Sequence, residues 1–207
     1  MHKQQIRFTK KVKRKFPIFF KGDIKVLDIG SYDINGSNRF LFDSNVDYLG
    51  LDIMEGPNVD IVSRCHEFNG TNESFDLVIS TECFEHDMYY KESIKKIVEL
   101  LKPGGLFVFT CATTGRPEHG TLRTTPENSA TAIANLSKEE IEWKNYYKNL
   151  TKEDISEIID LKKVFKRFKF SRHKRICDLY FYGIKHGENQ KFKEQRITLS
   201  EFFKSIF

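Results

Sequence analysis

Short apolar runs alternate with polar stretches through the first half of the chain. The runs are rich in β-branched and aromatic side chains and end at turn residues, a pattern typical of strands buried on both faces. Five such strands are predicted, at residues 25–30, 48–53, 59–62, 75–80 and 106–110. Two further strands, near 168–170 and 179–184, are close enough in sequence to pair antiparallel at an edge.

Between the fourth and fifth predicted strands, apolar residues recur with the spacing of an amphipathic helix, at positions 94, 97, 98 and 101. We expect this helix to end at Lys102, because Pro103 cannot continue it and the two following glycines permit a reversal. Alternation of strand and helix implies right-handed crossovers and an open sheet. The chain is therefore predicted to be one α/β domain over residues 1–207, Rossmann-like and doubly wound, mostly parallel, with an antiparallel C-terminal edge strand.

The basic residues of the chain are concentrated in two segments. The 34 Lys and Arg against 29 Asp and Glu give the 207-residue chain a net charge of +5. The excess gathers in a basic N-terminal segment, 1–22, and in 162–175, which contains no acid. Both segments are compatible with binding of an anionic partner, but we favour the simpler interpretation that they are solvated faces.

Composition excludes several protein classes. No apolar run approaches the roughly 18 residues that cross a bilayer, and residues 1–22 lack the apolar core of a signal peptide. The four cysteines have no CxxC spacing, so neither a disulfide framework nor a metal site is expected. We expect a cytoplasmic monomer or homodimer with no membrane span and no metal.

The turn after the first predicted strand carries the first chemical signal. It reads Asp28-Ile29-Gly30-Ser31-Tyr32. A dinucleotide site needs glycine at alternate positions so that pyrophosphate can approach the backbone, and Tyr32 stands at the second of them. No Gly-Lys-Ser/Thr sequence follows, so a P-loop is also absent. The pattern therefore disfavours a nicotinamide oxidoreductase.

Two carboxylates favour a cationic nucleoside instead. Asp28, at the end of the first strand, can neutralise a ligand ammonium. Asp52 lies 22 residues after Gly30, at the end of the second strand, and can accept hydrogen bonds from both ribose hydroxyls. Each acid by itself is also a common turn former. Together they describe a ligand that joins a nucleoside to an amino acid without phosphate, as S-adenosylmethionine does.

Four segments carry a family resemblance: VLDIGSYDINGS, YLGLDIMEGPNVDIV, FDLVISTECFEH and LLKPGGLFVFT. In this order and spacing, residues 24–112 resemble a class I S-adenosylmethionine-dependent methyltransferase of the small Rossmann-like kind. The family usually has Gly-x-Gly after the first strand, whereas Ser31 and Tyr32 follow Gly30 here. Similar SxDxNGS loops occur in a bacterial subset of the family, so we interpret this as a variant loop.

The resemblance implies S-adenosylmethionine as cofactor and S-adenosylhomocysteine as product. It places Asp28 and Gly30 at the methionine part, Asp52 at the ribose and Ile53 at the adenine. The acid that usually contacts the adenine amino group is missing, and a backbone group at Cys65 is expected to replace it. The predicted cofactor-binding residues are Asp28, Gly30, Ser31, Tyr32, Asp52, Ile53, Cys65, His66, Ser80, Thr81 and Glu82.

Two histidines follow predicted strands at the same edge of the sheet. His86 and His119 are candidate general bases for a hydroxyl acceptor, because imidazole titrates near neutral pH. Glu118, next to His119, is grouped with them as a catalytic candidate. His86 is equally compatible with a capping or packing role. His2, His173 and His186 lie in basic or terminal stretches and are expected on the surface.

The connection at 113–149 is longer than the links before it and is predicted to be a lid or substrate-binding insertion. Part of it should be helical, because Ser137-x-x-Glu140 is a capping box. Its arginines can bind a phosphate or carboxylate of the acceptor, or remain solvated while the aromatic residues form a small core. The candidate acceptor-binding residues are Arg116, Arg123, Tyr146 and Tyr147.

Local sequence motifs narrow the chemical class of the methyl acceptor. The Asp/Asn-Pro-Pro-aromatic motif of nucleobase amino methylation and the Pro-Cys motif of pyrimidine methylation are both missing. What remains is a hydroxyl, acid oxygen or simple amine of a small molecule. The variant loop favours O-methylation in bacterial capsule or surface-polysaccharide synthesis, on a sugar-linked or phosphate-bearing acceptor. Two alternatives stay open: an RNA methyltransferase, disfavoured by the lack of an RNA-binding module, and a non-catalytic partner subunit with the same fold.

Overall fold

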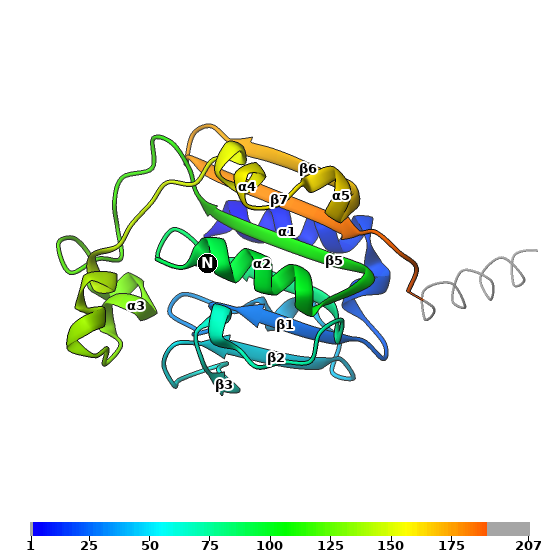
Figure 1. Ribbon diagram of the computed structural model, residues 1–207, viewed down its shortest axis with the longest axis horizontal. Coiled ribbons are helices and arrows are strands. Elements are labelled where there is room, and N and C mark those ends of the chain that lie inside the picture. The colour runs from blue at the N-terminus through cyan, green and yellow to red at the C-terminus, as the bar shows by residue number, and fades with distance from the viewer. Residues whose placement is uncertain (1, 190–207) are drawn as a thin grey trace, which may run out of the picture.

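A computed structural model describes residues 2–189 of the chain. Seven strands form one sheet in the order β3-β2-β1-β4-β5-β7-β6 (Figure 1). β1 to β5 are parallel, whereas β7 is antiparallel to both β5 and β6. This mixed sheet confirms the predicted Rossmann-like class. The strands are β1 Lys25–Ile29, β2 Asp47–Asp52, β3 Ile61–Val62, β4 Phe75–Thr81, β5 Leu101–Ala112, β6 Phe165–His173 and β7 Asp178–Lys185.

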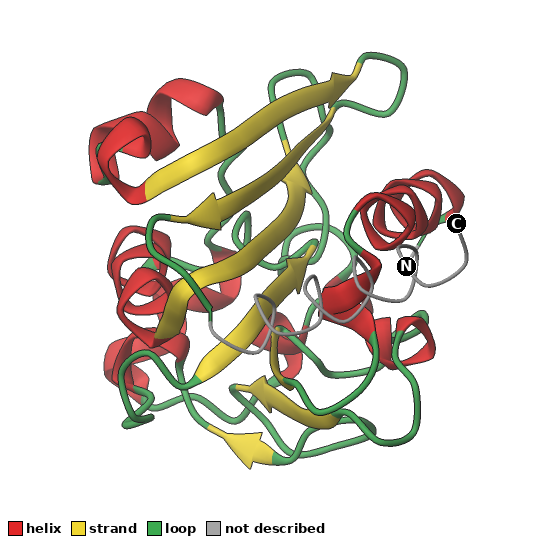
Figure 2. Cartoon of the chain, turned by 90° about the vertical axis from the view of Figure 1, so that its right-hand side faces the viewer, coloured by secondary structure: helices red, strands yellow, loops and turns green. Residues whose placement is uncertain are grey.

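Helices cover both faces of the sheet, which Figure 2 shows between two helical layers. One face carries α1, Lys3–Lys15, and the other carries α2, α4 and α5, while α3 lies beyond the carboxyl ends of the parallel strands (Figure 1). None of the helices in the described part of the chain has the length and hydrophobicity of a membrane span. The other helices are α2 Tyr90–Leu100, α3 Ala130–Ile133, α4 Lys152–Ile158 and α5 Leu161–Val164, and the 3₁₀ helices are Pro17–Phe20, Asn38–Leu41, Cys65–Glu67, Pro126–Asn128 and Lys138–Asn145.

Side-chain alternation along the strands divides the core in two. In β1, Leu27 and Ile29 pack toward α2, whereas Val26 packs toward α1. In β5, Phe107 belongs to the α2 side and Val108 to the α1 side. Successive side chains of a strand point to opposite faces. In a sheet that is covered on both faces, the strands are therefore apolar at consecutive positions and not only at alternate ones.

The basic N-terminal segment contains a helix that the sequence analysis did not predict. Gln5, Thr9 and Val12 are its buried positions, and seven Lys and Arg residues lie along the same helix. Polar and apolar residues do segregate onto opposite faces of this helix, but two of its three buried side chains are polar and apolar residues are few, so the buried face was not recognised.

Two predicted boundaries differ from the structure. β5 begins at Leu101 and includes Pro103, because a register irregularity against β4, between Phe75 and Leu77, accommodates the proline and the two glycines. β3 contains two residues where four were predicted. Its neighbour Asp60 lies outside the strand, and the Asp60 carboxylate accepts a 2.7 Å hydrogen bond from the Gly50 backbone.

The two C-terminal strands pair antiparallel as predicted, but β7 is not at the edge. It lies between β5 and β6, so β6 is the edge strand. The predicted basic run at 162–175 falls mainly on β6, where most lysines and arginines are exposed. Basic side chains on an edge strand oppose pairing with another chain, which favours the solvated-face interpretation of this run.

Candidate functional site

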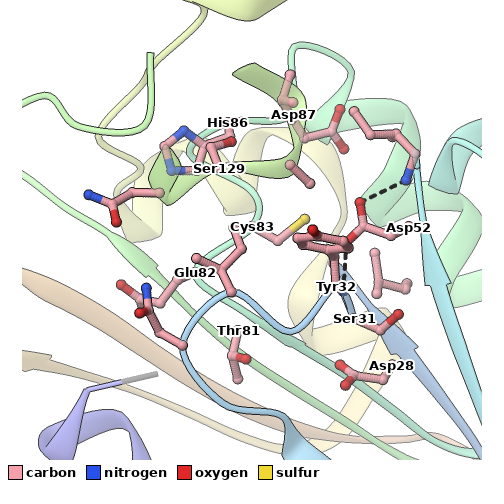
Figure 3. A pocket seen from close by; sticks show the side chains of 18 of the residues that line it. Asp28, Ser31, Tyr32, Asp52, Thr81, Glu82, Cys83, His86, Asp87 and Ser129 are labelled. Carbon is pink, nitrogen blue, oxygen red and sulfur yellow. Dashed lines mark hydrogen bonds between the residues drawn. The ribbon is translucent and has the colours of Figure 1, made fainter. Parts of the chain in front are cut away.

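A cavity of about 510 Å³ opens at the carboxyl ends of the parallel strands (Figure 3). The turn after β1 and the end of β2 bound one side, and the loops after β4 and β5 bound the other. Open α/β sheets bind ligands at this edge, where strand order reverses. Twelve residues predicted for the site line it: Asp28, Gly30, Ser31, Tyr32, Asp52, Ile53, Cys65, Thr81, Glu82, His86, Arg116 and His119.

Asp28 lies buried at the base of the cavity (Figure 3). Nδ2 of Asn38 donates to Oδ1 of Asp28 at 3.1 Å, and the Tyr48 hydroxyl donates to Oδ2. Burial raises the pKa of Asp28 to about 7, although both hydrogen bonds act in the opposite direction. A cationic group next to Asp28 favours the ionised carboxylate.

Asp52 joins the end of β2 to the turn after β1. Its Oδ2 accepts the backbone N–H of Tyr32 at 2.9 Å, and its Oδ1 accepts that of Ile53 at 2.7 Å. Burial raises the pKa of Asp52 to about 6 against these two hydrogen bonds. Because a carboxylate oxygen has two lone pairs, each oxygen retains one for a hydroxyl group in the cavity.

Gly30 permits the turn to pass close to the loop after β4. Its φ of +75° is in the left-handed region, and a Cβ at this position would lie 2.6 Å from the Cβ of Cys83. Ser31 follows with its Oγ buried, and this oxygen has no hydrogen-bond partner within residues 2–189. Gly30 and Ser31 both line the cavity, while the Ser31 hydroxyl itself is enclosed on the side of Gly50.

A charged network forms the wall after β4. The Nε2 of His2 lies 3.0 Å from Oδ2 of Asp178 and 3.5 Å from Oε2 of Glu82. Arg116 lies 3.2 Å from the other Asp178 oxygen. Hydrogen bonds to Asp178 and then Glu82 raise the pKa of His2 to about 9. Burial alone would raise the pKa of Glu82, but hydrogen bonds from His2 and Thr110 outweigh it and lower that pKa.

The expectation that His2 lies on the surface is therefore wrong. His2 precedes the first turn of α1, and docking of this helix on the sheet carries the imidazole into the cavity wall. No local pattern in the sequence predicts this position of His2, because its partner Asp178 is far along the chain.

His86 and His119 form the side of the cavity nearest the 113–149 segment. Their ring centroids are 5.2 Å apart, and Tyr147 packs against both rings. Burial, and then the neighbouring His119, lowers the pKa of His86 to about 3, and burial also lowers that of His119. Nε1 of Trp143 donates to the His86 carbonyl oxygen at 2.6 Å, so the segment is attached directly to this wall.

Six predicted site residues are not in the cavity wall: His66, Ser80, Glu118, Arg123, Tyr146 and Tyr147. The His66 ring packs at a tilt of 34° against Tyr89, with centroids 4.3 Å apart, and Ser80 is buried within β4. Glu118 pairs with Arg123 at 2.8 Å on the exposed side of its loop. Tyr147 packs against the rings of His86 and His119, which line the cavity.

Some cavity residues were not assigned from the sequence. Gln5 enters with α1, and Asn38 enters with the 3₁₀ helix that follows the NGS turn. Asp87 follows the Glu85-His86 pair, and Ser129 precedes α3. Only Asn38 had a usable local signal, since Ser37 is a typical cap residue and its side chain accepts the Arg39 backbone N–H.

The sequence and the fold were compared with those of known proteins. A family model described as a methyltransferase domain matches residues 1–151. No curated protein sequence gives a significant match. Phosphoethanolamine N-methyltransferase 2 of Haemonchus contortus, solved with S-adenosyl-L-methionine, is similar at a TM-score of 0.60 and 20% identity, covering 88% of this chain and 52% of that one. The chain thus spans about half the length of that enzyme.

The matches to two other solved structures extend over a larger share of those chains. The 1,6-didemethyltoxoflavin-N1-methyltransferase of Burkholderia thailandensis gives a TM-score of 0.58 at 14% identity, over 88% of this chain and 78% of that one. A SAM-dependent methyltransferase of Aquifex aeolicus gives 0.54 at 12% identity, over 85% and 88%. These likenesses establish the fold, and the family model matches most of the chain. The chain therefore belongs to the methyltransferase-domain family and has the class I, Rossmann-like fold of S-adenosylmethionine-dependent methyltransferases.

Proposed function

We propose that this chain binds S-adenosylmethionine in the cavity and methylates a hydroxyl group of a small-molecule acceptor. The observation that supports cofactor binding is the arrangement of the Asp52 carboxylate. Two backbone N–H groups hold it, and a lone pair is left on each of its oxygens. Two acceptor oxygens on one rigid carboxylate match the two adjacent hydroxyls of a ribose.

The remaining residues of the turn also fit this cofactor. Asp28 provides a carboxylate for the ammonium group of the methionine part. The buried Oγ of Ser31 and Oδ1 of Asn38 have no hydrogen-bond partner in the described chain, and buried polar groups normally have one. Close contact between Gly30 and Cys83 brings the backbone near the cavity. When bound, S-adenosylmethionine supplies an electrophilic methyl group on a sulfonium and is converted to S-adenosylhomocysteine.

We place the acceptor at the His86–His119 wall. In the tautomer in which Nδ1 of His119 donates to the Pro117 carbonyl oxygen, at 3.1 Å, Nε2 remains available to a hydroxyl group. Arg116 lines the same side and carries positive charge. Glu118 faces away and pairs with Arg123, so we assign it to stabilisation of the loop. The segment 113–149 would act as the acceptor-binding lid.

For the acceptor itself we retain the class favoured by sequence, a sugar-linked or phosphate-bearing hydroxyl compound of bacterial surface-polysaccharide synthesis. Arg116 supports an anionic group on this acceptor, since it lines the cavity and its contacts with Ile176 and Asp178 use Nη1 alone among the hydrogen bonds of the described chain. Methylation requires the acceptor oxygen about 3 Å from the methyl carbon in a water-poor site. A cavity enclosed by α1 and the 113–149 segment is suited to that requirement.

The test uses Trp143, the single tryptophan, which lines the cavity. S-adenosylmethionine and S-adenosylhomocysteine should change its fluorescence with a saturable, micromolar dependence, whereas NADH should not. Methyl-labelled cofactor is then incubated with panels of sugar phosphates, simple amines and RNA. Label on the sugar phosphates supports the proposal, whereas label only on RNA or amines, or no cofactor binding, refutes it.

A further inference from the structure

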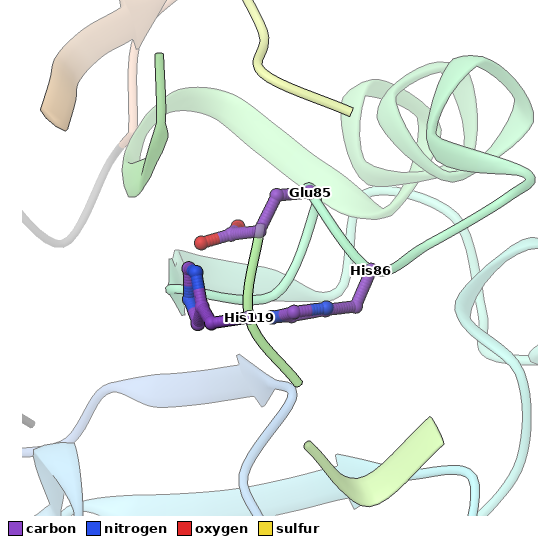
Figure 4. A group of neighbouring side chains, drawn as sticks. All are labelled: Glu85, His86 and His119. Atoms are coloured by element: carbon purple, nitrogen blue, oxygen red, sulfur yellow. The ribbon is translucent and has the colours of Figure 1, made fainter. Parts of the chain in front are cut away.

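Glu85, His86 and His119 converge at the acceptor side of the cavity (Figure 4). One potential ligand atom from each lies within 4.8 Å of the other two. Glu85 and His86 follow β4, and His119 follows β5, so the fold brings together residues that no local pattern connects. One carboxylate, a hard oxygen ligand, and two imidazoles, which are ligands of borderline softness, form a donor set that divalent transition metals accept.

The cluster contains acceptor atoms without a donor. Glu85 is fully buried; its Oε1 accepts the Ala112 backbone N–H at 3.1 Å, while its Oε2 has no hydrogen-bond partner within residues 2–189. Nδ1 of His86, a side chain that is 5% exposed, is likewise without a partner in that range. Leaving such atoms unsatisfied is costly, and a cation would satisfy them.

Surrounding contacts hold the backbone that carries Glu85 and His86 and orient the ring of His119. The Glu85 carbonyl oxygen accepts the Lys148 N–H at 2.9 Å, and the His86 carbonyl oxygen accepts from Trp143. Nδ1 of His119 lies 3.1 Å from the Pro117 carbonyl oxygen, which leaves Nε2 as the ligand nitrogen. Metal-binding histidines are commonly oriented by such a hydrogen bond from the other ring nitrogen.

A second cluster, His2, Glu82 and Asp178, is equally compact but differs in charge balance. Its carboxylates already lie beside the basic His2, and Asp178 also pairs with Arg116. A cation there would have to displace these partners. Glu85, by contrast, has no ion pair with any described residue.

We propose that Glu85, His86 and His119 bind one divalent transition-metal ion of the Mn²⁺, Co²⁺ or Zn²⁺ type. Three protein ligands leave coordination positions open. Resting on the proposed function, the metal takes Nε2 of His119 and contacts the acceptor hydroxyl in place of the imidazole, which lowers the pKa of that hydroxyl. The O–H bond then breaks with its electron pair left on oxygen, and the proton passes to water. This replaces the sequence expectation that no metal is present.

The experiment titrates untagged, chelator-treated protein with Co²⁺ and follows visible d–d absorption. The proposal predicts one saturable site, with affinity at least about tenfold weaker in Glu85→Gln and in His119→Ala. His186→Ala is the matched control, because this exposed histidine contacts only the Lys162 carbonyl oxygen among the hydrogen bonds of its ring. Binding that is the same in all four proteins, or absent from the wild type, overturns the proposal.

Cofactor binding is measured on the same samples, which separates this inference from the proposed function. Trp143 fluorescence should respond to S-adenosylhomocysteine in metal-free wild type as in the loaded protein. A cobalt site without any cofactor response would support the metal site and refute the function. If Glu85→Gln does not fold, the half-buried His119→Ala decides the result.

Discussion

The backbone N–H of Tyr32 donates a 2.9 Å hydrogen bond to Oδ2 of Asp52. This bond connects the turn after β1 with the end of β2, so one contact positions both parts of the proposed cofactor site. The other oxygen of Asp52 accepts from Ile53. Both ends of the carboxylate are therefore fixed before a ligand arrives, which lowers the cost of ordering the site on binding.

Replacing this carboxylate should weaken cofactor binding. Asp52→Ala is expected to reduce affinity for S-adenosylmethionine by about 1–3 kcal/mol, because charge-assisted contacts to the ribose are lost. Calorimetric titration measures the change. Asp47→Ala, at the exposed start of the same strand, is the control and should bind normally. Equal affinity of Asp52→Ala and wild type would show that the ribose lies elsewhere.

Two glycines provide a matched pair. Gly30 and Gly22 have similar left-handed φ values, +75° and +78°, but a Cβ would contact Cys83 at 2.6 Å only at Gly30. Alanine at Gly22, where no described heavy atom lies within 4 Å, should cost about 1–2 kcal/mol for backbone strain. Gly30→Ala should cost more in urea unfolding and also weaken cofactor binding. Identical losses in the two variants would contradict the close-contact argument.

Asp28 should make stability depend on pH. Burial raises its pKa from 3.8 to about 7, so the folded chain keeps a proton that the unfolded chain has lost. Its contribution to the free energy of unfolding therefore falls as pH rises from about 4 to about 7, by at most about 1.4 kcal/mol per unit. The groups facing it are Tyr48, Asn38, Asp52 and Arg39. Asp28→Asn should show a smaller decline in urea unfolding across this range; an unchanged slope would rule the effect out.

His2 should act in the same sense as Asp28, but over a higher pH range. Asp178 and Glu82 raise its pKa from 6.5 to about 9, so the ion pair stabilises the folded chain fully below pH 6.5 and is lost as pH rises through about 9. The difference in unfolding free energy between wild type and His2→Gln should be largest near pH 6 and disappear by about pH 10. His186→Gln, whose ring contacts a carbonyl oxygen, should show no such trend. A difference independent of pH would contradict the pairing.

Local pattern was sufficient for much of the fold. Apolar runs identified the strands of the parallel sheet, and the residues that end β1 and β2 were recognisable as candidate ligand-binding positions. Asp28, Gly30 and Asp52 line the cavity because carboxyl ends of adjacent parallel strands necessarily meet at one edge. Their placement follows from topology, which the order of elements dictates.

Sequence therefore determined the class of fold and the strand-end half of the site, since both depend on neighbours in the chain and on a topological rule. The tertiary structure alone decided the docking of α1, the pairing of His2 with Asp178, the meeting of Glu85 with His119, and the packing of His66 against Tyr89 outside the cavity wall. These contacts join residues far apart in the chain. They depend on how side chains pack once the sheet and its covering helices are assembled, and no periodicity encodes that packing.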